Sequence, residues 1–205
     1  MRHETFPLPM ARAQIVPILT AIGSILFLGI FTIAVYLRGH AELALYLRDP
    51  AATFHHSPFA GLISNIGILA LVVTGTSCLL AAHAGLLDRG LLRAIGLFSL
   101  FLALDDLLML HEVVLPRIGI SETMVFLIYG VVALVIGWRY RDELRLDEPS
   151  GLHLAIALLA SSVVADKLLE MNEVEVLAED GLKFVGLLTW SAYWIGEAIR
   201  SIKAR

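Results

Sequence analysis

The sequence contains a single cysteine, Cys78, so an internal disulfide and a cysteine-based zinc site are both excluded. Charged residues are scarce: they make up 17% of the chain, against about 25% in a typical soluble domain. No run of basic residues indicates binding to nucleic acid. The sequence also contains no H-E-x-x-H, P-loop or nucleophile-elbow motif, which are the signatures of metalloproteases, NTPases and α/β-hydrolases respectively.

Apolar residues, by contrast, make up 58% of the chain, above the roughly 45–50% of soluble domains. They are concentrated in runs near the roughly 20 residues that an α-helix needs to cross a bilayer. The pattern predicts an all-α, multi-pass protein of the cell (inner) membrane, folded as a single transmembrane domain over residues 1–205. The predicted bundle has six transmembrane helices, at about 14–37, 58–84, 91–115, 119–138, 151–170 and 181–199.

The distribution of charge predicts the orientation of these spans. With six spans both termini lie on one side, and that side would carry most of the arginine and lysine residues. Basic residues near spans mark the cytoplasmic face, so both termini are predicted to be cytoplasmic. Most of the acidic residues fall in the outer half or the outer loops. Trp138 and Trp194 are expected in an aromatic belt at the inner interface.

One stretch breaks the apolar pattern. The sequence LDDLLMLHE, residues 104–112, carries three carboxylates and a histidine inside a predicted span. It begins a motif that recurs without a gap, because DDLLMLHEV at 105–113 aligns with DKLLEMNEV at 166–174. Two similar helical hairpins would bring both acidic stretches to the outer side. Chance similarity or a shared lipid-facing composition is the alternative explanation for so short a match.

Helix geometry limits what these acids can do together. On a continuous helix Asp105 and Glu112 share a face but stand about 10.5 Å apart, whereas Asp166 and Glu170 are one turn apart. We therefore expect a deep tier of Asp105 and Asp166, with Ser162 one turn below Asp166. The expected outer rim consists of Glu112, Glu122, Glu170, Glu173 and Glu179. His111 would lie about 120° from the Asp105 stripe on such a helix. The predicted metal ligands are Asp105, His111, Glu112, Asp166, Glu170, Glu173 and Glu179, and Asp106 is the predicted catalytic acid–base residue.

Carboxylates near the centre of a membrane helix are costly, by about 2.5–3.5 kcal/mol each on insertion scales, unless they are protonated, paired or bound to a cation. Oxygen ligands with an occasional imidazole suit divalent metal ions, so the expected cofactor is a divalent metal whose identity the residues do not fix. The alternative is structural ion pairing that holds the helices together, with Lys167 and Lys183 as counter-ions.

Three functions follow from this pattern. The first is a metal-dependent membrane enzyme whose acidic site opens to the outside. The second is a divalent cation or proton-coupled transporter, since a site near the midplane suits alternating access. The third is a non-catalytic subunit or assembly factor whose acids form structural ion pairs. The expected partners are the lipid bilayer and another membrane protein or a second copy of the chain, with no nucleic acid.

Overall fold

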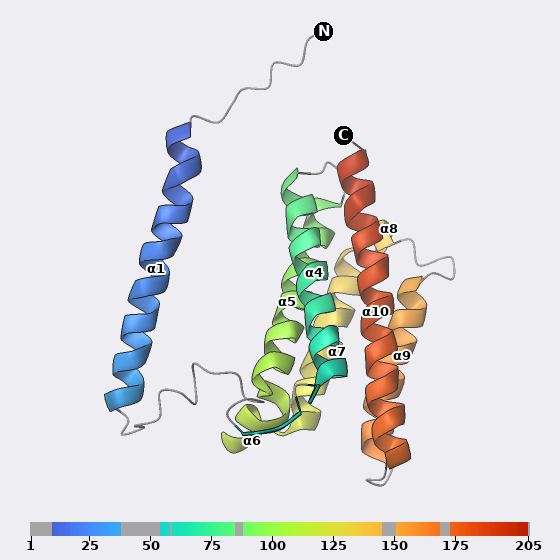
Figure 1. Ribbon diagram of the computed structural model, residues 1–205. Helices are drawn as coiled ribbons and strands as arrows, with labels where there is room; N and C mark the ends of the chain where they lie inside the picture. Colours follow the sequence, from blue (N-terminus) through green and yellow to red (C-terminus); the bar gives the residue numbers. More distant parts are fainter. Residues whose placement is uncertain are drawn as a thin grey trace. The chain divides into compact units, whose positions relative to one another are not determined.

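A computed structural model describes residues 10–37, 54–57, 59–84, 88–144, 151–168 and 173–204 (Figure 1). The regular structure in these ranges is helical, with no strand, so the prediction of an all-α fold is confirmed. The chain divides into two units, residues 1–60 and residues 61–205. The first unit contains one long helix, α1 (Met10–Leu37), which is apolar over most of its length.

The second unit holds the other helices that the structure describes. The long ones are α4 (Leu62–Ala84), α5 (Arg89–Leu108), α7 (Glu122–Arg139), α9 (Gly151–Leu168) and α10 (Glu173–Lys203). Between α5 and α7 lie a turn of π-helix, η1 (Leu110–Val114), and the short α6 (Leu115–Arg117), and after α7 comes α8 (Arg141–Leu144). Helix α4 packs against α5 and α10, and α10 packs in turn against α9 (Figure 1).

The core of the second unit lies where α4, α5, α9 and α10 meet. Helix α10 contributes a side-chain stripe at helical spacing, Leu187, Trp190, Trp194 and Ala198. The Trp190 ring nitrogen donates a hydrogen bond of 3.0 Å to the Ser99 hydroxyl on α5, which ties the two helices together. Trp194 is 1% exposed. The prediction that it belongs to an interfacial belt is therefore wrong, because its ring fills the core instead.

Helices α4 and α5 approach each other closely at a pair of glycines. A Cβ atom added at Gly75 would lie 2.5 Å from Leu100 Cγ and 2.9 Å from the Gly96 carbonyl oxygen. A Cβ added at Gly96 would lie 3.0 Å from the Gly75 carbonyl oxygen. Small residues that allow two helix backbones to touch are typical of helix pairs in membranes, where packing replaces the hydrophobic effect between helices.

Among the described residues, two helices are long and apolar enough to cross a membrane, α4 and α7. Helix α5 has a similar length but carries Arg93, Asp105 and Asp106. The apolar parts of α1 and α9 are shorter, within the described residues. The six-span topology, its orientation and the inner-membrane location therefore stay predictions.

The predicted helix over 91–115 is not continuous. Helix α5 ends at Leu108, and Met109 adopts a left-handed conformation with φ 48°. The chain then re-enters a helical path as η1, where the Val114 N–H reaches back to the Met109 carbonyl oxygen at 3.2 Å. π-Helical turns are rare in proteins, and those that occur are often found at functional sites. This break is what positions the residues described next.

Candidate functional site

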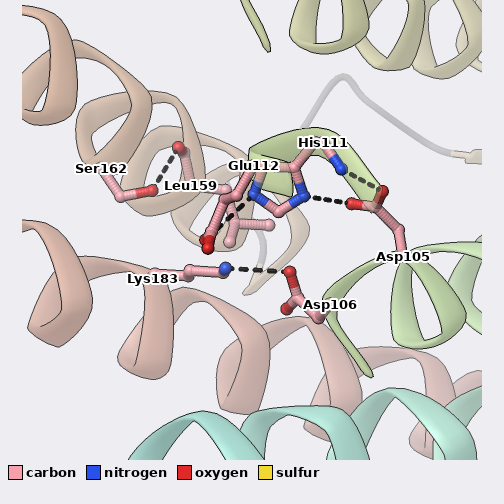
Figure 2. A network of polar contacts seen from close by, with 7 residues as sticks. All are labelled: Asp105, Asp106, His111, Glu112, Leu159, Ser162 and Lys183. Carbon is pink, nitrogen blue, oxygen red and sulfur yellow. Dashed lines mark hydrogen bonds and ion pairs between the residues drawn. The ribbon is translucent and has the colours of Figure 1, made fainter. Parts of the chain in front are cut away.

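Asp105, in the last turn of α5, is nearly fully enclosed, with 2% of its surface exposed. Its carboxylate accepts two hydrogen bonds from one residue, His111 of η1. One comes from the backbone N–H at 3.1 Å, and the other from ring Nδ1 at 2.5 Å (Figure 2). His111 stands near the start of η1, where a backbone N–H has no partner within the helix, so Asp105 caps the new helix while it holds the imidazole.

This contact corrects the expected geometry. A continuous helix would place His111 about 120° away from Asp105. The left-handed Met109 interrupts the helix, and the turn that follows brings His111 against the Asp105 carboxylate. His111 is itself buried, and its ring lies against Phe126 of α7, with 5.2 Å between ring centroids.

Asp106 faces a different partner, as expected from its position one residue further along α5. The Lys183 ammonium on α10 donates a hydrogen bond of 3.0 Å to Asp106 Oδ1 (Figure 2). Lys183 was one of the two predicted counter-ions, and this ion pair joins α5 to α10. Glu112 completes the group: one of its carboxylate oxygens lies 3.4 Å from His111 Nε2, and its side chain is half exposed.

We call Asp105, Asp106, His111, Glu112 and Lys183 the His111 cluster. Three carboxylates share one ammonium in it, so negative charge is in surplus whether or not the imidazole is protonated. Asp105, Asp106 and His111 each offer a ligand atom, and these atoms all lie within 4.8 Å of one another. Such a group could hold a metal ion, because carboxylate oxygens and imidazole nitrogen are common ligands of divalent metals.

One residue beside the cluster was not expected from the sequence. Tyr129 of α7 packs edge-on against Phe101 and Phe126. Its hydroxyl is buried and lies close to Asp105, although no hydrogen bond of good geometry joins the two. The Asp105 carboxylate is therefore the acceptor nearest to hand for this hydroxyl.

With this geometry in view, the comparison with protein families can be stated. The family model described as domain of unknown function (DUF8692) matches residues 13–195. The chain belongs to this family. No curated protein and no solved structure matches the chain, so its function is argued from the site itself.

The other predicted site residues have varied places. Asp166 belongs to α9 and Glu173 to α10, but both side chains lie outside the described part, and Glu170 lies outside the described residues altogether. Glu179 lies on α10 one turn before Lys183. Ser162 is buried, and its hydroxyl donates to the Leu159 carbonyl of its own helix at 2.9 Å (Figure 2). The second acidic stretch therefore stays a prediction.

Proposed function

We propose that this chain is an integral membrane protein that holds a divalent cation at the His111 cluster. Six spans with cytoplasmic termini in the cell (inner) membrane remain part of this proposal, on the strength of the basic residues near the predicted cytoplasmic ends. The observation that carries the cation site is the convergence of the ligand atoms of Asp105, Asp106 and His111 within 4.8 Å.

Helix α7 supports the membrane location. It is apolar along its length, yet Val125 is its one buried residue. Leu127, Val131 and Leu134 are 65%, 57% and 73% exposed. Apolar surface of this extent is rare on soluble monomers, and an apolar core helix of a soluble protein would be mostly buried. Exposing these side chains to water is unfavourable, whereas lipid tails surround them with an apolar solvent.

Burial and charge support the cation. Asp105 and His111 are 2% and 4% exposed, so water does little to compensate the charge at the cluster. Lys183 pairs with Asp106, and the one imidazole of His111 contacts both Asp105 and Glu112, so the three carboxylates still outnumber the cations beside them. A divalent cation would balance that surplus, and the half-exposed Glu112 gives it a path of entry.

Metal analysis of the detergent-purified full chain tests the proposal. We expect about one equivalent of divalent metal in the wild type and its loss in His111→Ala. His83→Ala is the matched control, because it also removes one histidine. His83 is exposed in the last turn of α4 and does not belong to the His111 cluster, which includes Asp105 of α5. A folded wild type that takes up no metal from a metal-supplemented buffer would contradict the proposal.

The ion pair between Lys183 and Asp106 favours a second candidate function, a non-catalytic membrane subunit whose charges lock helices together. Lys183→Met separates the two. If a cation binds at the cluster, removing the neighbouring ammonium relieves repulsion, and metal affinity rises. If the cluster is a structural lock, the same change leaves Asp106 unpaired, and thermal stability falls with no metal involved.

If a cation binds, two functions remain to be distinguished, a metal-dependent enzyme and a cation transporter. A metal-dependent enzyme would use Asp106 as an acid–base group beside the metal, whereas a transporter would move the cation itself. Proteoliposomes loaded with a metal-sensitive dye distinguish them. Influx that depends on His111 supports transport, and tight retention of the metal without flux contradicts it.

A further inference from the structure

The end of α7 carries aromatic and basic residues that lie beside the first turn of α5. A Cβ atom added at Gly90 of α5 would lie 3.0 Å from Tyr140 Cε1, so the Tyr140 ring contacts the α5 backbone. The guanidinium carbon of Arg139 lies 5.2 Å from the centroid of the same ring, within cation–π range. Figure 1 shows that α5 begins and α7 ends at the same end of the second unit. Tyr140 therefore joins an arginine of α7 to the start of α5.

Two arginines of α5 flank this contact. Arg89 and Arg93 are one helical turn apart, so they share a face of the helix. Arg93 comes three residues after Gly90, which places it about 60° around the helix from the residue that meets Tyr140. Both arginine side chains are exposed, as is Arg139. Three guanidinium groups thus surround the contact between Gly90 and Tyr140, and none of them is enclosed by the protein.

Positive charge is in excess at this end of the second unit. The first turn of α5, the end of α7 with α8, and the last turns of α10 carry six basic residues and four acidic ones: Arg89, Arg93, Arg139, Arg141, Arg200 and Lys203 against Asp88, Asp142, Glu143 and Glu197. Arg200 is paired with Asp88 and Glu197. Within the described ranges, Arg93 and Arg139 form no ion pair. The surplus therefore favours an anion beside Tyr140.

Trp138 indicates the depth at which this charge lies. Its side chain is 75% exposed, in the last turn of an apolar helix and directly before Arg139. Tryptophan at the end of a membrane helix is typical of the lipid headgroup region, and basic residues beside it mark the cytoplasmic face. In the proposed topology this end is cytoplasmic, and the cytoplasmic leaflet is the one that carries anionic lipids. The anion within reach is therefore the phosphate of a lipid.

We propose that Arg89, Arg93 and Arg139, arranged around Tyr140, bind the headgroup of an anionic phospholipid. We call these four residues the Arg139 patch. A guanidinium group suits a phosphate because its N–H donors match two phosphate oxygens at once. The acyl chains would lie along the exposed face of α7. The inference rests on the proposed membrane location and does not depend on a cation at the His111 cluster.

The test is titration of the detergent-purified full chain with phosphatidylglycerol or with phosphatidylcholine of the same acyl chains, with bound lipid counted by native mass spectrometry. The first phosphatidylglycerol should bind about tenfold more tightly than the first phosphatidylcholine or better. One basic residue at an anionic membrane surface contributes about fivefold in affinity. Arg93→Gln and Arg139→Gln should therefore each weaken phosphatidylglycerol binding about fivefold and leave phosphatidylcholine binding unchanged.

Two further variants serve as controls. Arg117→Gln removes an exposed arginine of α6, which follows the opposite end of α5, and should leave the affinity for both lipids unchanged. Arg139→Lys keeps the positive charge and should retain most of the affinity that Arg139→Gln loses. Inorganic phosphate in large excess should not displace the lipid, because it has no acyl chains to contact α7.

The outcomes distinguish this inference from the proposed membrane location. Equal affinity of the wild type for the two lipids, or equal weakening by Arg117→Gln and Arg139→Gln, would overturn the Arg139 patch and leave the membrane location in place. Displacement by inorganic phosphate would identify a soluble anion as the ligand and overturn the assignment to lipid. A chain that alkaline carbonate releases from native membranes is not an integral membrane protein, and that result would remove both proposals.

Discussion

Replacing Asp105 with alanine should destabilise the protein more than replacing His111, although the two side chains form one pair. Asp105 accepts both the backbone N–H and the ring N–H of His111. In Asp105→Ala both donors lose their acceptor inside a nearly closed site. In His111→Ala the ring bond is lost, but the backbone N–H of residue 111 keeps its bond to the carboxylate.

The magnitudes follow from these contacts. Hydrogen bonds to a charged group contribute about 1.5–3 kcal/mol each. His111→Ala, which loses one such bond, should therefore lower the free energy of unfolding by about 1.5–3 kcal/mol, and Asp105→Ala by about 3–5 kcal/mol, the range for breaking a buried charged pair. The double variant should be hardly less stable than Asp105→Ala alone, because the ring bond can be lost only once. The resulting coupling energy is about 1.5–3 kcal/mol.

Unfolding in detergent, followed by circular dichroism with denaturant, measures all four proteins of this cycle. A strong chelator must be present throughout, because a metal bound to the native state would add its own stabilisation to the wild type. The reasoning is refuted if the two single effects add to within about 0.5 kcal/mol in the double variant. It also fails if His111→Ala is the more damaging change.

Three further predictions concern other features. Met109→Gly should stabilise the chain by about 1 kcal/mol, because Met109 has φ 48° and its half-exposed side chain packs little. Gly75→Ala should cost about 1–3 kcal/mol through overpacking, whereas Gly130→Ala, with no atom within 4 Å of the added Cβ, should stabilise α7 by about 0.5–1 kcal/mol. Val131→Lys should cost about 2.5–3.5 kcal/mol in a translocon insertion assay, although Val131 is 57% exposed.

Thermal unfolding measures the Met109 and glycine variants. A destabilised Met109→Gly would mean that the methionine side chain, and not its backbone strain, matters there. Equal effects at Gly75 and Gly130 would show that the close contact between α4 and α5 does not exist. Insertion unchanged by Val131→Lys would point to α7 as a helix covered by protein instead of lipid, since an exposed lysine on a soluble surface changes stability by no more than about 0.5 kcal/mol.

The sequence carried enough information to predict the helices, because long apolar runs allow few other structures. The run over 119–138, for example, corresponds closely to α7 (Glu122–Arg139). The end of α5 at Leu108 could not be predicted from the sequence, because neither proline nor glycine interrupts the apolar pattern there. A left-handed methionine is tolerated there because bonds made elsewhere, from His111 to Asp105, hold the turn in place.

The missed break explains what was missed at the site. The angle between two side chains around a helix can be predicted only while the helix is continuous. The sequence therefore predicts His111 about 120° away from Asp105, whereas its ring contacts the Asp105 carboxylate in the structure. Lys183 could be proposed as a counter-ion from its charge alone, but its choice of Asp106 depends on how α10 packs beside α5. Tyr129 gave no signal, because one tyrosine in an apolar helix has the same appearance as an interfacial aromatic residue.

The placement of the tryptophans gives the protein two separate optical reporters. Trp190 and Trp194 are 8% and 1% exposed in the core, whereas Trp138 on α7 is 75% exposed. Brominated lipid quenches indole emission on contact, so in bilayers it should dim Trp138 and spare the pair on α10. In Trp138→Phe the remaining fluorescence would come from α10 alone, the helix that carries Lys183. Emission from that variant could then follow how α10 responds when an ion reaches the cluster.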